Sequence, residues 1–374
     1  MSKLTMAAVA LSLFAVGGST SAQQATPPPP DALDGVDVVV LIQQGKEVFG
    51  KSEFRSTHGG FTYLFSSAQT KSEFEKAPEK YAIQLGGLCA RMGGTVTGNP
   101  SDYVVHDGKI YIFGSDECHK LFVATPGKYL PKPAAPMPTG GDAVAKGRAL
   151  LDKAAIAHGG KKLDSVSSYL EAWTVTQQRQ TGPVSISNKN LWRFPGEARN
   201  ERVIPLASGP MTVAMTMTPA GAWGVGNGGR VMLPPPGVVP AIEGALWRQL
   251  IPLLRVRRET NIKVASLGPA TIDGATFERV RLVRGGVDVT LHLDAASGRV
   301  HSMTYVDRKS DGEVGAIAIV YGDYQALDGV LIPFSETATF NGAPNTTLTR
   351  RIDTVTVNAP VDSQLFVPPA GLGK

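Results

Sequence analysis

The chain has 374 residues, of which 42% are hydrophobic and 18% charged, and it contains 42 glycines and 27 prolines. This composition excludes a disordered or fibrous protein and is typical of a globular chain rich in turns, long enough for two or more domains. The formal net charge is only +5 and no block of like charges occurs, so nothing indicates a nucleic-acid partner.

The N-terminal residues have the order of an export signal. Lys3 precedes an apolar run from Met6 to Val16, and small residues follow up to Ala22. This order predicts a signal peptide over residues 1–22, and hence a periplasmic or secreted protein. The apolar run is too short to cross a bilayer, and no later run is long enough, so no transmembrane segment is expected. Residues 23–34 are expected to form a proline-rich linker.

Two segments that follow align without a gap. "HGGFTYLFSSAQTKSEFEKAPEKY" (58–81) matches "HDGKIYIFGSDECHKLFVATPGKY" (106–129) at an offset of 48 residues. Each copy predicts a strand or hairpin with alternating aromatic residues, followed by a short helix and a proline. Capping-box spacing places the helix starts at Ser66 and Gln69 in the first copy, and at Gly114 and Glu117 in the second.

The order of an aromatic strand, F-x-S, a short helix with a phenylalanine and P-x-K-Y resembles the YHS domain, here in tandem over residues 35–130. In this resemblance "GVDVVVLIQQGKEVFGKSEF" (35–54) corresponds to a first strand and loop. YHS domains and their zinc- or copper-associated relatives often carry one cysteine before the hairpin and two at the start of the helix. Cys89 and Cys118 match two of these positions and Gly114 stands at the third, whereas the first copy holds Asp37, Ser66 and Thr70.

The only two cysteines leave three interpretations open. Thiolate and imidazole ligands suit copper or zinc, so Cys89, Cys118 and His119, with His106 as a further donor, are candidate metal ligands. Adjacent helical residues point about 100° apart, however, which makes it difficult for Cys118 and His119 to share one ion. In an exported chain the pair also fits a Cys89–Cys118 disulfide. We favour this disulfide, or a buried thiol, over metal binding.

A second linker is expected over residues 131–141, and residues 142–374 form a further predicted domain. Asp142 is expected to cap a helix over "AVAKGRALLDKAAIAHGG" (143–160). Ten segments with period-two alternation follow, separated by short turns. They predict one large antiparallel sheet, curved or partly closed, and the fold class of the whole chain is therefore α+β, mainly antiparallel β.

One helical segment interrupts the predicted strands. "AIEGALWRQLIPLLRVRRE" (241–259) reads as a helix or a pair of helices kinked at Pro252. Its apolar residues extend around most of the helix, so the segment is expected to be buried or to lie against something apolar. These residues include Leu246, Trp247, Leu250, Leu253 and Leu254.

Residues 142–374 resemble the periplasmic lipoprotein-carrier (LolA-like) fold, an unclosed barrel with helices on its concave side. The resemblance rests on "AHGGKKLDSVSSY", "GAWGVGNGGRVMLPP", "LWRQLIPLL", "YGDYQALDGVLIPF" and "VTVNAPVDSQLF". It implies a hydrophobic or lipid-like ligand, for which the candidate lining residues are Trp223, Leu246, Trp247, Leu250, Leu253 and Leu254.

Enzymatic functions find no support in sequence motifs. The chain contains no H-E-x-x-H or H-x-x-E-H motif, no G-x-S-x-G and no phosphate-binding glycine loop of the P-loop type. We therefore expect a non-enzymatic envelope protein that binds a hydrophobic ligand. Copper or zinc binding by the tandem module and a role as an interaction scaffold for an envelope protein are the alternatives.

Overall fold

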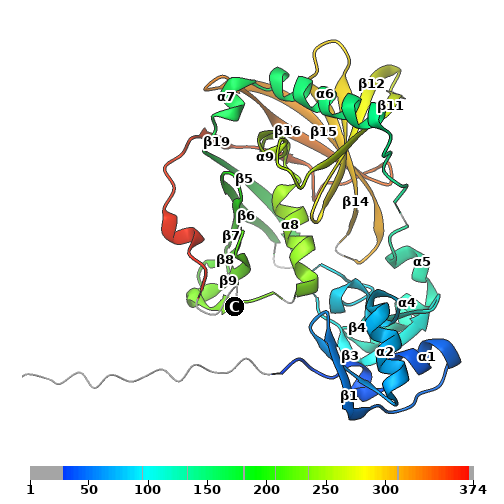
Figure 1. Cartoon of the computed structure of the whole chain (residues 1–374). Coiled ribbons are helices and arrows are strands. Elements are labelled where there is room, and N and C mark those ends of the chain that lie inside the picture. Colours follow the sequence, from blue (N-terminus) through cyan, green and yellow to red (C-terminus); the bar gives the residue numbers. More distant parts are fainter. Residues whose placement is uncertain are drawn as a thin grey trace, which may run out of the picture.

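The structure, a computed structural model, describes residues 28–369 except 95, 133, 180–181, 207, 235 and 310. The predicted signal peptide lies outside these residues. As the sequence predicts, the fold is α+β and mainly antiparallel β. Residues 32–129, here called the hairpin module, lie beside one end of residues 141–366, here called the β domain (Figure 1). No helix in the described part of the chain has the length and apolar character needed to span a membrane.

The hairpin module contains the same order of elements twice, at a constant offset of 48 residues from the first strand onward. Each unit consists of a two-stranded antiparallel hairpin followed by two short helices. The first unit comprises β1 (Lys51–His58), β2 (Phe61–Phe65), α2 (Ala68–Lys76) and α3 (Pro78–Tyr81). The second unit comprises β3 (Asn99–His106), β4 (Lys109–Phe113), α4 (Asp116–Ala124) and α5 (Pro126–Tyr129).

A tight turn precedes each hairpin, at η1 (Ala32–Gly35) and η2 (Gln84–Gly87). Both turns have positive φ at three successive residues, Leu33 to Gly35 in one and Leu85 to Gly87 in the other. In the first unit the chain then forms α1 (Val38–Gln44), although the sequence predicts a strand there. The reason is Asp37, whose carboxylate accepts hydrogen bonds from the backbone N–H groups of Val39 and Val40 and so starts a helix in a β-branched run.

The helix caps of the two units differ by one residue from the prediction. Ser67 and Ser115, rather than Ser66 and Gly114, occupy the cap positions of α2 and α4. Their hydroxyl groups accept hydrogen bonds from the backbone N–H groups of Thr70 and Cys118. Ser66 instead donates its hydroxyl and its backbone N–H to Asp37 at 2.7 Å, which ties the preceding turn to the hairpin.

The β domain begins with α6 (Gly141–Ala157) and α7 (Lys161–Asp164). The N-cap of α6 is Gly140 and not the predicted Asp142, which lies in the first turn. Two sheets follow, where the sequence predicts one. The first contains β5 (Ser168–Arg179), β6 (Gly182–Arg193), β7 (Glu197–Ile204), β8 (Met211–Thr218), β9 (Gly221–Val225), β10 (Val231–Met232) and β19 (Thr354–Val357).

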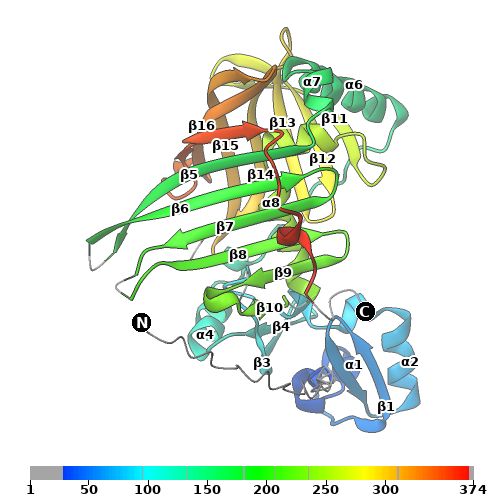
Figure 2. The same cartoon turned by 90° about the vertical axis from the view of Figure 1, so that its left-hand side faces the viewer.

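The second sheet is built mainly from the C-terminal third of the chain. It contains β11 (Lys263–Ile272), β12 (Ala275–Arg284), β13 (Val287–Asp294), β14 (Val300–Arg308), β15 (Val314–Leu327), β16 (Val330–Phe340), β17 (Ala343–Pro344) and β18 (Arg350–Arg351). All pairings in both sheets are antiparallel, and the strands follow one another mostly in chain order. Figure 2 shows the first sheet face-on, with β5 to β9 side by side.

Between the two sheets lie α8 (Val239–Trp247) and α9 (Leu250–Val256), as Figure 1 shows. The largest cluster of buried apolar side chains joins these helices to α6 and to both sheets. Two smaller clusters form the cores of the hairpin units. Leu88 of the hairpin module belongs to the large cluster, so the core of the β domain extends into the junction between the two parts.

Candidate ligand-binding site

The predicted apolar segment is a pair of short helices, α8 and α9, whose break falls at Arg248 and Gln249. Pro252 lies in the first turn of α9, where its missing N–H costs no hydrogen bond, so the helix begins before the proline instead of kinking at it. All six predicted lining residues are at most 3% exposed, and five of them, Leu246, Trp247, Leu250, Leu253 and Leu254, lie on α8 and α9. Each contributes about 1.5 to 3 kcal/mol relative to an exposed position.

Few polar contacts hold this helix pair to the first sheet. The indole N–H of Trp192, on β6, donates to the carbonyl oxygen of Leu246 at 3.1 Å. On the second sheet, the Arg284 guanidinium lies 4.4 Å from the ring centre of Trp247 and forms ion pairs with Glu243 and Glu259. Most of the stabilisation therefore comes from apolar packing, because helices of nine and seven residues have little stability of their own.

The sixth predicted residue, Trp223, lies on the opposite face of the first sheet. Across the sheet, Trp192 pairs with Ala198, Ala198 pairs with Met217, and Met217 pairs with Ala222, the neighbour of Trp223. These paired residues share one face of the sheet, and Trp192 on that face contacts α8. Since successive side chains of a strand point to opposite faces, Trp223 points away from α8 and α9. The structure brings five of the six residues together and separates Trp223 from them.

A buried polar cluster lies next to the break between α8 and α9, and sequence motifs gave no signal for it. Arg350 forms ion pairs with Glu336 at 2.7 Å and with Glu171 at 3.3 Å, and its guanidinium lies over the ring of Trp173. It also donates to the side-chain oxygen of Gln249. Because β5 carries Glu171 and β16 carries Glu336, this arginine joins the two sheets.

Two carboxylates share this one arginine, so the cluster has an excess of negative charge. Burial raises the pKa of Glu171, although Arg350 acts in the opposite direction. Asn190 donates to Glu171 at 3.0 Å, and Asn200 in turn donates to Asn190 at 2.7 Å. The first sheet thus has a polar row on its inner face beside the apolar residues that contact α8.

Cys89 and Cys118 lie together in the second hairpin unit, both buried and both as free thiols. Burial raises the pKa of Cys118, but hydrogen bonds with Ser115, Arg91 and Cys89 outweigh this effect and lower it. The Cys89–Cys118 disulfide stays a prediction.

His119 does not point toward the thiols. Its Nδ1 contacts the carboxylate of Asp102, and its ring stacks on Phe113 with centroids 4.5 Å apart. His106 contacts Asp107 and lies edge-on to Phe122. Among the residues that the structure describes, no three histidine, cysteine or acidic side chains are grouped to hold a metal ion. Copper or zinc binding at Cys89, Cys118 and His119 stays a prediction.

No protein-family model and no curated protein sequence matches the chain. Among solved structures, a putative outer membrane lipoprotein-sorting protein domain from Vibrio parahaemolyticus is similar with a TM-score of 0.39 and 9% identity, covering 59% of this chain and 96% of that one. A DUF1329 family protein from Desulfovibrio piger gives 0.39 and 11%, covering 60% and 97%. A LolA superfamily protein from Nitrosomonas europaea gives 0.38 and 12%, covering 59% and 97%.

These similarities are too weak to decide function. Two of the three descriptions name lipoprotein sorting or the LolA superfamily. At such TM-scores, membership of the carrier family stays a prediction, as does the YHS assignment of residues 35–130.

Proposed function

We propose that the β domain binds a hydrophobic or lipid-like ligand on the inner faces of its two sheets, at the place that α8 and α9 occupy. The proposal rests on the way in which α8 and α9 pack between the two sheets. Two short helices insert buried apolar side chains between two sheets, and their ion pairs, Glu243 with Arg284 and Arg248 with Asp307, are made with the second sheet rather than the first. An acyl chain offers the same kind of surface, so it can replace the apolar helix side chains at the first sheet, where the hydrogen bond of Trp192 to Leu246 is the polar contact that would be lost.

The inner face of the first sheet extends the apolar surface beyond the helices. Val175, Ile204, Met211 and Val213 lie on the face that Trp192 shares, because strand alternation and register place them there. All four are only half-buried. A ligand that displaces part of the helix pair would therefore find further apolar side chains along the same strands.

Energy transfer tests this proposal. The delipidated full chain is titrated with cis-parinarate, a fluorescent fatty acid that accepts tryptophan emission. We expect saturable binding with transfer that falls in Trp247→Phe, whereas Trp223→Phe, on the far face of the sheet, changes it little. Absence of binding, or transfer carried by Trp223 alone, would contradict a ligand at α8 and α9.

We also propose that the protein works in the cell envelope, on the evidence of the signal-peptide pattern in residues 1–22. N-terminal sequencing of protein from the periplasm or medium checks this. The mature chain is expected to begin at Gln23, and recovery of an intact N-terminus from the cytoplasm would contradict export. The proposal assigns no catalytic residue and needs no cofactor.

A further inference from the structure

A pocket with a volume of about 970 Å³ lies between the hairpin module and the β domain. This volume and a position at an interface between two parts of a chain are typical of sites for small organic ligands. The module contributes the turn at His58 and the segment 83–96, and the β domain contributes the start of α8 and the end of β14. The pocket lies at the N-terminal end of α8, whose Pro240 and Ala241 line it, and none of the six predicted lining residues of the inner site borders it.

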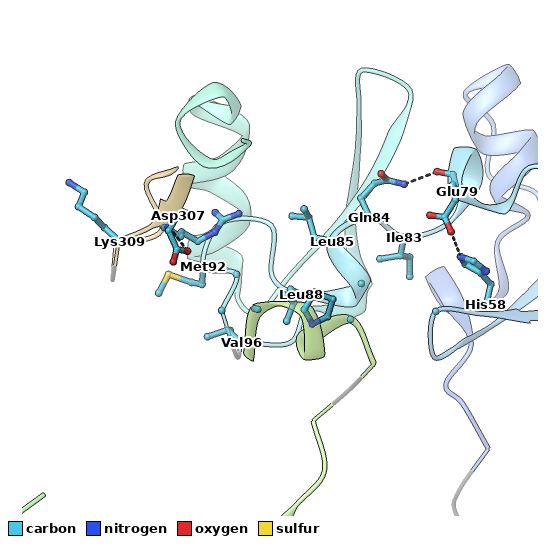
Figure 3. Close-up of a pocket in the computed structure, with 18 residues that line it drawn as sticks. His58, Glu79, Ile83, Gln84, Leu85, Leu88, Met92, Val96, Asp307 and Lys309 are labelled. Carbon is cyan, nitrogen blue, oxygen red and sulfur yellow. Dashed lines mark hydrogen bonds and ion pairs between the residues drawn. The ribbon is translucent and has the colours of Figure 1, made fainter. Parts of the chain in front are cut away.

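The middle of the pocket is apolar. Figure 3 shows Leu85, Leu88 and Val96 between Asp307 and Lys309 at one end and Glu79 and His58 at the other. Val96 is 40% exposed, which is unusual for a side chain enclosed by two domains. Ile83 and Met92 extend this apolar lining. An apolar chain in the pocket would remove from water the exposed surface of Val96 and the remaining surface of Leu85 and Met92, whereas Leu88 and Ile83 are already buried.

Most of the charged groups around the pocket already have partners. Asp307 forms an ion pair with Arg248, and Glu79 with His58. Lys309 lies 3.0 Å from Glu313. Each of these charged groups already has a partner of opposite charge, so none of them needs a charged ligand.

Arg308 is different. Its Nη1 donates to the carbonyl oxygens of Ala90 at 3.2 Å, Arg91 at 2.8 Å and Gly312 at 2.9 Å. No described residue accepts a hydrogen bond from its Nε or Nη2, and no described carboxylate lies within 4.0 Å of it. Burial lowers the pKa of this guanidinium, and the nearby Cys89 and Asp307 offset the effect only in part. A cation in this state gains most from an anion with two acceptor oxygens.

The backbone makes room for the Arg308 guanidinium beside the pocket. A Cβ atom on Gly93 would fall 2.4 Å from Nε of Arg308, so only glycine permits the guanidinium to lie there. Gly93 and Gly94 both have positive φ and both line the pocket. Arg308 itself lines the pocket, together with the apolar residues of segment 83–96.

We propose that this pocket binds an anionic amphiphile, with its carboxylate or phosphate on Arg308 and its apolar chain along Leu85, Leu88 and Val96. This site is additional to the proposed ligand site at α8 and α9. Both head groups offer the paired oxygens that the guanidinium lacks, and competition experiments distinguish them.

The test uses the delipidated full chain and compares cis-parinarate with its neutral methyl ester. A charge-assisted bidentate contact predicts that the ester binds this site roughly tenfold or more weakly. Displacement by palmitate but not by lysophosphatidate identifies a carboxylate ligand, and the reverse identifies a phosphate. Equal binding of acid and ester, or displacement by neither competitor, overturns the proposal.

Matched variants locate the site. Ala241 is exposed on α8 and lines the pocket, whereas Ala245 is exposed one turn later and does not. Ala241→Phe is expected to weaken this binding roughly tenfold or more by filling the pocket, and Ala245→Phe to leave it unchanged. Arg308→Gln should weaken the acid and not the ester. Unchanged affinity in Ala241→Phe overturns the site even if Arg308→Gln fails to fold.

The same variants separate this proposal from the previous one. Energy transfer that depends on Trp247 should persist in Ala241→Phe, because the helix pair and its inner contacts are unaltered. If the wild-type chain binds the acid selectively but shows no energy transfer that depends on Trp247, only the proposed function of the inner faces is contradicted.

Discussion

The backbones of Gly86 and Gly237 lie in direct contact and join the hairpin module to the β domain. A Cβ atom on Gly237 would fall 2.1 Å from the carbonyl oxygen of Gly86, and one on Gly86 would fall 2.2 Å from Cα of Gly237. No side chain fits between the two segments. The junction that frames the pocket therefore depends on glycine at both positions.

Gly237→Ala is expected to destabilise this junction by about 1 to 3 kcal/mol, because the methyl group meets backbone that cannot turn aside. Urea unfolding monitored by fluorescence measures the change. Gly141→Ala is the control, since a Cβ there meets nothing within 4 Å and its φ is not positive. Equal midpoints for the two variants would show that the modules are not held by this contact.

Arg350 is expected to be essential for stability, and its neighbour Arg351 is not. Arg350→Met leaves Glu171 and Glu336 buried without their cation, which costs about 3 to 5 kcal/mol. Arg351 pairs with Asp323 at the surface and is 69% exposed, so Arg351→Met should change the free energy of unfolding by less than about 1 kcal/mol. Thermal unfolding of both variants compares them. A similar effect of the two substitutions would contradict the role of the buried cluster.

The stability of the β domain is expected to fall between pH 6.5 and 4 because of His158. This side chain is fully buried, contacting the Leu331 carbonyl oxygen through Nδ1 and accepting the Val300 N–H through Nε2. Burial lowers its pKa from 6.5 to about 4. In this range the unfolded chain takes up a proton that the folded chain does not, which costs roughly 3 kcal/mol at the acid end.

Unfolding midpoints across this pH range measure the effect. His158→Gln should be less stable at neutral pH but should lose part of the decline between pH 6.5 and 4. If the variant and the wild type decline in parallel, His158 is not the group responsible.

The thiols of Cys89 and Cys118 should be oxidised to a disulfide in exported protein, since the fold already places them together. Closing this loop would stabilise the chain by roughly 3 to 4 kcal/mol. Mass spectrometry after alkylation, together with metal analysis of the same sample, tests the expectation. Two alkylated cysteines with near-stoichiometric copper or zinc would favour the metal-binding alternative instead.

Local sequence signals predicted the elements well and their long-range relations poorly. The two hairpin units follow from the spacing of aromatic residues, and the helix pair from its apolar residues. The resemblance implies a first strand and loop within residues 35–54, but residues 38–44 form a helix because Asp37 caps it, and Asp37 also accepts a hydrogen bond from Ser66 that pattern alone does not show. Tryptophan is a residue type that often lines apolar ligand sites, but only the strand register shows that the Trp223 side chain points away from α8 and α9.

The charged groups were the least predictable part. Arg350, Glu171 and Glu336 are far apart in the sequence and meet only because β5 and β16 approach each other. Arg308 likewise resembles any surface arginine until the hairpin module covers it. No sequence motif marks Arg350 or Arg308, because the groups around each arginine come from elements that only the tertiary fold brings together.

Amide hydrogen exchange shows whether a lipid-like ligand takes the place of α8 and α9 between the sheets. The delipidated full chain is compared with and without saturating palmitate. We expect faster exchange at residues 239–256 while β12 and β13 keep their protection. Unchanged or slower exchange at residues 239–256, with any effect confined to residues 84–97 at the junction, would contradict the claim.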